Sequence, residues 1–395
     1  MKDRRNLLLL CGSLLVAVAL FEIGVRLSGL DYNLSPNWRY HPVLGWSQVP
    51  NGSYDVAVEG RPVHVSFNAL GFRDVDHQVA KPAGVKRIVV IGDSFCEAIQ
   101  VNLEETFQKQ LERLLNADSS ARWEVINLGV GDFGTAQAWI ALNEYGLAYR
   151  PDVVIQQIFP LNDICNNALG LYSLCRSHND RYRPYFVEEG GGLKQTSGAP
   201  LLAWLRRHVV TYQVLEYWKV KLVDPDPHSP RDPGRLRRMA RAGFTGLDPL
   251  LYTFVPAAEQ PEAVAQGWRV TELLTERIVS ATRERGMAYL GMVVPFETVL
   301  LPEWEAFAAA QPAPRMQPRY AEQRLDSLFN RLGVPSVMLY DEFQPYLTEV
   351  LPFVGGHLNV AGHRRAAEAL YRRLVEAGIA GSPPAPQNAR ARSSR

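Results

Sequence analysis

Hydrophobic residues in the middle of the chain form short uninterrupted runs that alternate with amphipathic segments. The runs lie at residues 87–94 (RIVVIGDS), 123–128, 151–159, 289–294 and 336–340. Runs of this length are typical of strands that are buried on both faces of a sheet. Segments with helical spacing of apolar residues lie at 107–115, 135–149 and 319–332. The alternation predicts an α/β fold in which helices cover both faces of a parallel sheet.

The pattern closes with a last helix. We expect Asn359 to cap its start and Gly378 to end it, at about residue 377. A long irregular segment, at about residues 166–261, separates the third strand from the fourth and contains three successive glycines at 190–192. It also contains a basic run made of Arg231, Arg235, Arg237, Arg238 and Arg241. We interpret the segment as a solvated insertion; the alternative is a patch for phosphate or lipid headgroups. An insertion here overhangs the carboxyl edge of the sheet, where ligands bind in open α/β folds.

The N-terminus has the pattern of an export segment. Lys2, Arg4 and Arg5 precede an apolar run at residues 7–21. Residues up to 30 complete a membrane span if the charged side chains of Glu22 and Arg26 reach the far interface. Basic residues before the run keep the N-terminus in the cytoplasm. We therefore predict a single-pass anchor with an extracytoplasmic body. The alternative is a signal peptide cleaved near residues 17–19 (AVA), which leaves a secreted protein.

Composition and charge narrow the class of protein. The chain has 395 residues, of which 47% are hydrophobic and 21% charged, and this excludes a disordered, collagenous or polytopic membrane protein. With 42 Lys+Arg against 41 Asp+Glu, the net charge of +1 argues against a dedicated nucleic-acid binder. We divide the chain into an anchor at 1–30, a small β-rich lead-in at 31–82, the α/β domain at 83–380 and a disordered tail at 381–395.

The four cysteines fit an oxidising compartment. Cys165 and Cys175 lie in a turn-rich stretch and are candidates for a disulfide, whereas Cys11 and Cys96 have no obvious partner. The cysteines do not have the spacing of a zinc site. The sequence therefore predicts neither a metal nor a cofactor.

Polar clusters follow the first and third predicted strands and precede the last helix. They are residues 92–95 (GDSF), 160–163 (PLND) and 356–359 (GHLN). Alone, Ser94 is compatible with a helix cap, Asn162 with a turn and His357 with an ordinary buried or surface histidine. Together they supply a hydroxyl nucleophile, an imidazole base and an amide donor for an oxyanion. This combination predicts acyl transfer.

The same motifs resemble the SGNH, or GDSL-type, hydrolase family, and in particular its membrane-anchored extracytoplasmic branch. The resemblance spans about residues 40–374. It rests on residues 92–95 (GDSF), 127–137 (NLGVGDFGTAQ), 161–163 (LND), 357–363 (HLNVAGH), 41–46 (HPVLGW) and 68–74 (NALGFRD). It implies a three-layer α/β/α sandwich of the flavodoxin-like type. By this resemblance Ser94 is the nucleophile, His357 is the general base, and the Ser94 backbone N–H and Asn162 belong to the oxyanion hole.

The chain departs from the family pattern at two places. Asp132 stands where the family has a glycine whose N–H completes the oxyanion hole, so we expect either that its carboxylate points away from the oxyanion or that the hole uses a neighbouring residue. The acid that usually orients the histidine is missing, because Val354 and Gly355 occupy its positions. We expect a Ser94/His357 dyad in which a backbone carbonyl orients the imidazole, with Glu349 or Asp341 as the alternative acid. We interpret His363, in the last helix, as structural.

The sequence thus predicts an anchored serine esterase that acts on an ester-bearing small molecule or glycan, for example O-acetyl groups of the cell envelope. An O-acyltransferase would use the same residues and differ only in the acceptor. A catalytically silent binding module is a further alternative, motivated by the missing acid. A phosphate-binding protein that uses residues 92–94 as an anion loop is disfavoured, because neither GxxxxGK[ST] nor GxGxxG occurs.

Overall fold

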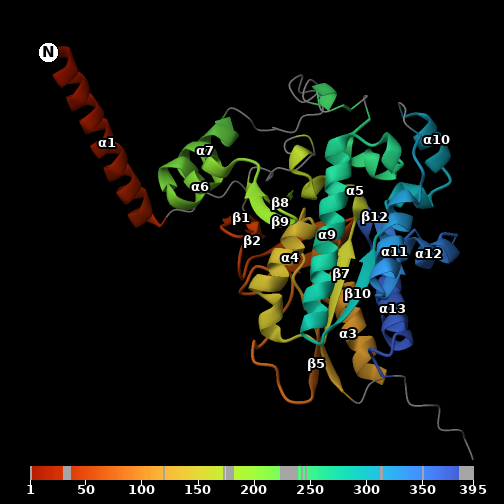
Figure 1. The fold of residues 1–395 in the computed structure, drawn as a ribbon. Coiled ribbons are helices and arrows are strands. Elements are labelled where there is room, and N and C mark those ends of the chain that lie inside the picture. The colour runs from red at the N-terminus through yellow and green to blue at the C-terminus, as the bar shows by residue number, and fades with distance from the viewer. Residues whose placement is uncertain are drawn as a thin grey trace, which may run out of the picture.

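The computed structural model of the chain is shown in Figure 1. It describes residues 2–29, 37–118, 121–171, 174, 182–222, 239–241, 243–244, 247–311, 315–348 and 351–381. The predicted basic positions 231–238, and the predicted tail beyond residue 381, lie outside the described residues.

A five-stranded parallel sheet forms the centre of the molecule (Figure 1). Its strands are β5 (Val85–Ile91), β6 (Arg122–Asn127), β7 (Val153–Ile158), β10 (Ala288–Val293) and β11 (Ser336–Met338). The spatial order is β11-β10-β7-β5-β6, and every neighbouring pair is parallel. This is the flavodoxin-like order of a doubly wound sheet, whose ligand-binding crevice lies between the first and third strands in the sequence. The prediction of an α/β fold with a central parallel sheet is confirmed.

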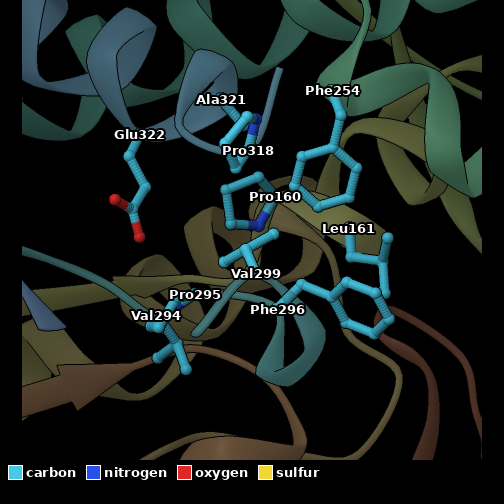
Figure 2. A pocket seen from close by; sticks show the side chains of 10 residues that line it. All are labelled: Pro160, Leu161, Phe254, Val294, Pro295, Phe296, Val299, Pro318, Ala321 and Glu322. Atoms are coloured by element: carbon cyan, nitrogen blue, oxygen red, sulfur yellow. The ribbon is translucent and has the colours of Figure 1, made fainter. Parts of the chain in front are cut away.

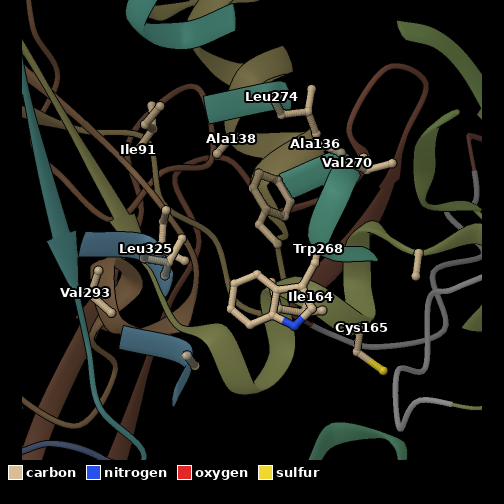
Figure 3. Close-up of a cluster of buried hydrophobic side chains, with 14 of the residues drawn as sticks. Ile91, Ala136, Ala138, Ile164, Cys165, Trp268, Val270, Leu274, Val293 and Leu325 are labelled. Atoms are coloured by element: carbon tan, nitrogen blue, oxygen red, sulfur yellow. The ribbon is translucent and has the colours of Figure 1, made fainter. Parts of the chain in front are cut away.

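Helices cover both faces of this sheet because side chains along each strand alternate between the faces. Ile88 and Val90 of β5 face α3 (Phe107–Asp118) and α13 (Val360–Glu376). Val89 and Ile91 of the same strand face α4 (Thr135–Glu144), α9 (Glu262–Glu284) and α11 (Tyr320–Leu332). Figure 3 shows this second core, where Ile91 and Val293 of the sheet lie near side chains of α4, α9 and α11. The result is the expected three-layer α/β/α sandwich.

Three sequence expectations differ from the structure. The helix expected over 135–149 ends at Glu144 and is followed by a 3₁₀ turn, η2 (Gly146–Tyr149). The strand expected over 336–340 is only β11, and the chain then turns into α12 (Leu339–Phe343), whose buried residues Leu339 and Phe343 have helical spacing. The helix α9 was not expected, although it crosses from β7 to β10 and is required between two parallel strands.

The insertion is more regular than the sequence suggests. It contains a hairpin, β8 (Pro184–Glu189) with β9 (Gly192–Ser197), and two helices, α6 (Pro200–His208) and α7 (Val210–Leu222). A 3₁₀ helix, η5 (Pro249–Phe254), follows. The predicted glycine triplet lies at the turn of the hairpin, where Gly190 and Gly191 have positive φ angles. Composition alone did not reveal these elements, because their apolar residues are interspersed with charges.

Two antiparallel hairpins precede the sheet, β1 (Trp38–His41) with β2 (Gly45–Gln48) and β3 (Ser53–Val58) with β4 (Arg61–Ser66). They are joined to the sheet by Arg73, which is completely buried. The Arg73 guanidinium donates to the carbonyls of Glu97, Ala98 and Val101, beyond the end of β5. The lead-in therefore braces the chain that follows β5, where the candidate site begins.

Short elements at the carboxyl edge carry the polar clusters. They are α2 (Ser94–Glu97), α5 (Pro160–Asn167), and the hairpin of β12 (Phe353–Val354) with β13 (His357–Leu358). As expected, the Asn359 side chain caps α13 by accepting the Gly362 N–H at 3.0 Å, and Gly378 follows the end of α13 with φ of 68°. Cys165 in α5 is disulfide-bonded and Cys11 and Cys96 are free, whereas Cys175 lies outside the described residues.

The N-terminal helix α1 (Lys2–Ser28) projects from the body (Figure 1). Its stretch Arg4–Ser28 has 25 residues and a mean hydropathy of 2.4, and among the described helices it is the one long and apolar enough to cross a membrane. A signal sequence has the same length and composition. The helix fits both the predicted anchor and its alternative.

Candidate active site

Ser94 lies at the turn between β5 and α2, at the carboxyl edge of the sheet. The side chain of Asp93, not that of Ser94, caps α2 by accepting the Phe95 N–H at 2.9 Å. The Ser94 hydroxyl is therefore available for another partner. Gly92 is required at this turn, because an added Cβ would come within 2.3 Å of Oε1 of Gln157.

His357 is held over Ser94 by the β12–β13 hairpin. The turn of this hairpin consists of Gly355 and Gly356, whose φ angles are 54° and 79°. A two-residue hairpin of type I′ requires positive φ at both positions, which glycine adopts without strain. The turn brings Nε2 of His357 to 2.9 Å from Oγ of Ser94. The imidazole also packs on the Phe95 ring, with 5.1 Å between ring centroids.

The other ring nitrogen of His357 faces a backbone carbonyl. Its Nδ1 lies 3.4 Å from the Gly355 oxygen, a long hydrogen bond. A hydrogen on Nδ1 in this contact leaves the Nε2 lone pair to accept the hydrogen of the Ser94 hydroxyl. Burial lowers the pKa of His357, and the Gly355 contact opposes this shift. The imidazole is therefore neutral at neutral pH, the form that a general base needs.

The expected substitute acids do not contact this ring in the part of the chain that the structure describes. Asp341 lies on α12 and is exposed, with its carboxylate 2.7 Å from the guanidinium of Arg319. Glu349 lies outside the described residues. Among described residues, the bonds of the His357 ring go to Ser94 and to the Gly355 carbonyl.

Asn162, the predicted oxyanion donor, lies in the first turn of α5 directly after β7. Its Nδ2 donates to Oδ2 of Asp93 at 3.1 Å. An amide carries two hydrogens, so one remains for a ligand. Because Asp93 is the neighbour of Ser94 in the chain, this bond fixes the Asn162 amide beside the nucleophile. Asp93 is a positioning residue that we did not single out in the sequence, although it stands inside the GDSF motif.

Asp132, where the resemblance predicts a glycine, has a backbone in the left-handed conformation that glycine favours, with φ of 65°. Its carboxylate is held by Nη2 of Arg183 at 3.0 Å and by Nδ2 of Asn166 at 3.3 Å. Arg183 also donates to the Asp132 carbonyl at 2.7 Å and stacks over the Trp46 ring at 4.7 Å. These contacts neutralise and restrain the carboxylate. Arg183 belongs to the insertion and has no motif that could have indicated it.

The turn that carries Asp132 is braced by the lead-in. The Trp46 indole donates to the Gly131 carbonyl at 3.0 Å, and the Gly131 N–H donates to the buried carboxyl group of Glu97. The Gln48 amide also donates to Glu97. Burial raises the pKa of Glu97 to about 7. The lead-in thus sets the backbone on which a second oxyanion N–H is expected.

Two buried carboxyl groups lie beneath the site. Asp163 accepts the Phe159 N–H at 2.8 Å and the Thr135 hydroxyl at 3.0 Å. Burial raises the pKa of both Asp163 and Asp93, and the neighbouring Asp93 carboxylate raises the pKa of Asp163 further. The pair therefore favours keeping one proton at neutral pH. In the described residues, no three His, Cys, Asp or Glu side chains are arranged to hold a metal ion.

His363 lies in the first turns of α13 and is completely buried. Its Nδ1 accepts the Phe107 N–H at 3.2 Å, and its ring stacks on the Phe107 ring. Burial lowers its pKa to about 3. A neutral histidine that satisfies a helix N–H is structural, as expected.

A small cavity opens at the carboxyl ends of β7 and β10 (Figure 2). Its free volume is about 10 Å³, which is room for roughly one water-sized molecule, and its surface is mostly apolar. Its lining is Pro160, Leu161, Phe254, Val294, Pro295, Phe296, Val299, Pro318, Ala321 and Glu322. Burial raises the pKa of Glu322 to about 8, so its carboxyl group is largely protonated at neutral pH. One lining residue, Leu161, directly precedes Asn162 in the chain, so the cavity lies next to the proposed oxyanion donor.

Comparisons with known proteins give similarity of fold only. No protein-family model matches the chain, and no curated protein matches it. The acetyl xylan esterase AlAXEase is 12% identical over 72% of this chain and 98% of its own, with a TM-score of 0.37. LAE5, an alpha/beta hydrolase enzyme from the metagenome of Lake Arreo, Spain, is 13% identical over 78% of this chain and 100% of its own, with a TM-score of 0.40. TesA is 12% identical over 73% of this chain and 98% of its own, with a TM-score of 0.37. Scores and identities this low carry no argument about activity or substrate.

Proposed function

We propose that the chain is a serine esterase that forms an acyl-enzyme on Ser94 with His357 as general base. The observation that carries this proposal is the 2.9 Å contact between Nε2 of His357 and Oγ of Ser94, at the crevice where doubly wound sheets bind ligands. A hydrogen-bonded hydroxyl and imidazole are the signature of an activated serine. The Gly355 carbonyl takes the orienting role that a carboxylate has in a triad.

The proposed reaction has two steps. The Ser94 oxygen attacks the ester carbonyl carbon while its proton passes to Nε2 of His357, and the carbonyl oxygen becomes an oxyanion. The intermediate collapses, the ester bond to the alcohol breaks, and His357 returns the proton to the leaving alcohol. Water then attacks the acyl-serine by the same route and releases the acid. The oxyanion is bound by the Ser94 N–H, the Asn162 amide and the backbone N–H of Asp132.

We propose an envelope component, such as an O-acetylated glycan, as the substrate class. The support for this is the predicted compartment, because the apolar N-terminal helix fits an anchor or a signal peptide and either one would direct the body out of the cytoplasm. A neutral serine, a neutral imidazole and amide donors suit an uncharged ester. They supply no cation for a phosphate group.

Labelling by a fluorophosphonate probe tests the proposal. The purified full-length chain should be labelled at neutral pH, and Ser94→Ala and His357→Ala should abolish the labelling. Ser327→Ala is the matched control, since this exposed serine on α11 bonds only within its helix. The absence of Ser94-dependent labelling at neutral pH overturns the proposal, and a chain that is not labelled at all is a silent binding module.

The acyl acceptor needs a second measurement. With an activated acetyl ester as donor, hydrolysis releases acetate in water alone. An O-acyltransferase would consume the donor slowly in water alone and faster when an oligosaccharide acceptor is added, and the acetyl group would then be recovered on the acceptor instead of as acetate. We propose the hydrolase, because no acceptor site is built from the residues named above.

A further inference from the structure

The two helices of the insertion expose large apolar side chains. Leu201 and Trp204 of α6 are 67% and 54% exposed, and Leu215, Trp218 and Leu222 of α7 are 64%, 51% and 74% exposed. Their spacings of three and four residues put them on one face of each helix. We call these five residues the apolar face. Apart from α1, no other segment of the described chain gathers as many exposed large apolar residues.

The opposite side of the same helices is charged and buried. Arg206 of α6 and Glu216 of α7 are both buried, with Nη1 of Arg206 3.6 Å from Oε2 of Glu216. The hydroxyls of Tyr182 and Tyr212 donate to the same Glu216 carboxylate. A surface helix in water normally turns its apolar stripe inward and its charges outward. Here Arg206 and Glu216 lie inward and the apolar face turns outward, so the surroundings of these five apolar residues are expected to be apolar.

The helix pair is fastened to the end of α1. The Glu22 carboxylate accepts the N–H groups of Val210 and Thr211 at 2.9 and 2.7 Å, and so caps α7. Nη2 of Arg26 donates to the His208 carbonyl at 2.7 Å. A carboxylate and a guanidinium are costly in hydrocarbon, so this turn of α1 marks the membrane surface. The junction of α6 and α7 is held at that level, beside the end of α1 (Figure 1).

We propose that α6 and α7 lie in the outer interface of the membrane that α1 crosses, with the apolar face among the lipid headgroups and upper acyl chains. This inference rests on the interpretation of α1 as an uncleaved anchor and goes beyond the proposed esterase activity. Tryptophan is enriched at this depth because its ring is apolar and its N–H is polar. The exposed side chains of Arg207 and Lys219 on the same helices suit lipid phosphates.

Depth-dependent fluorescence quenching tests the inference on the full chain. The protein is reconstituted in vesicles of phosphatidylcholine and phosphatidylglycerol, with or without phosphatidylcholine brominated high on its acyl chains. The emission lost in Trp204→Phe/Trp218→Phe, relative to wild type, reports the two interfacial indoles. We expect brominated lipid to reduce this difference signal at least twofold. Trp123→Phe is the control, because Trp123 is buried in β6 and its difference signal should not change.

Extraction of the same vesicles with alkaline carbonate separates the possible outcomes. A chain that resists extraction but shows no quenching of the difference signal overturns the inference and leaves the anchor intact. If carbonate releases the chain, both the interpretation of α1 as a membrane anchor and the inference about α6 and α7 are overturned. Unquenched indoles together with concentration-dependent crosslinking of the full chain identify a second copy as the occupant, which also overturns the proposal. Fluorophosphonate labelling of the double variant should equal that of wild type, so these results are independent of the catalytic proposal.

Discussion

The hairpin turn that carries His357 allows a sharp test of how the imidazole is positioned. Gly356 has φ of 79°, and an added Cβ meets no atom within 4 Å. The cost of Gly356→Ala is therefore backbone strain alone, about 1–2 kcal/mol for a left-handed residue with a side chain. Because each strand of the hairpin has only two residues, we expect the turn to relax rather than bear the strain. A penalty of this size lowers the ratio of native to relaxed turn about 5- to 30-fold.

The assay compares kcat/KM for an activated acetyl ester with the melting temperature. Gly356→Ala should reduce kcat/KM by up to about 30-fold, because His357 leaves Ser94 when the turn relaxes. Gly378→Ala is the matched control, since it has φ of 68° and equally open space at the end of α13. It should lower the melting temperature and leave kcat/KM unchanged. Gly356→Asn should retain more activity than Gly356→Ala, because asparagine tolerates the left-handed region better.

One result would refute this reasoning. If Gly356→Ala keeps the wild-type kcat/KM while its melting temperature falls as much as that of Gly378→Ala, the surroundings hold the turn in place. The two-residue strands would then not be the weak point on which the position of His357 depends.

The other predictions concern the charged groups. Because burial lowers the pKa of His357 below its ordinary 6.5, kcat/KM should stay level near neutral pH and fall only as pH drops through that lowered value; a midpoint above 6.5 contradicts this. Arg183→Met should lower kcat/KM about 10-fold or more by releasing the Asp132 carboxylate, and adding Asp132→Gly should restore activity; lack of rescue assigns the loss to packing instead. Asp341→Asn should leave kcat/KM within twofold of wild type, since Asp341 pairs with Arg319, and a hundredfold loss in a steady-state assay would make it the orienting acid.

The sheet was predictable because strands buried on both faces need continuous apolar runs. The runs at 87–94, 123–128, 151–159 and 289–294 locate β5, β6, β7 and β10 to within a few residues. The fifth run, at 336–340, predicted the end of its strand wrongly. The spacing of Leu339 and Phe343 is compatible with a helix as well as with a strand, and the chain there forms α12. Local pattern does not distinguish the two when the run is short.

The site was predictable only where it lies within motifs. Ser94 and His357 stand in such segments, and the fold brings their side chains into contact. Arg183 and Gln48 come from parts of the chain without a motif, and their roles depend on which distant turn they meet after folding. The buried ion pair of Arg206 and Glu216 could not be predicted either, because neither residue lies in a motif and the pair exists only after folding.

The disulfide at Cys165 affects when the site matures. Cys165 lies in α5, the same helix that presents Asn162 to the nucleophile. A disulfide forms only after a chain has left the reducing cytoplasm. If the body is exported as proposed, the cross-link on the segment that carries the proposed oxyanion donor forms on the far side of the membrane. On the proposed export route, the helix that presents Asn162 is not yet cross-linked when the chain leaves the cytoplasm.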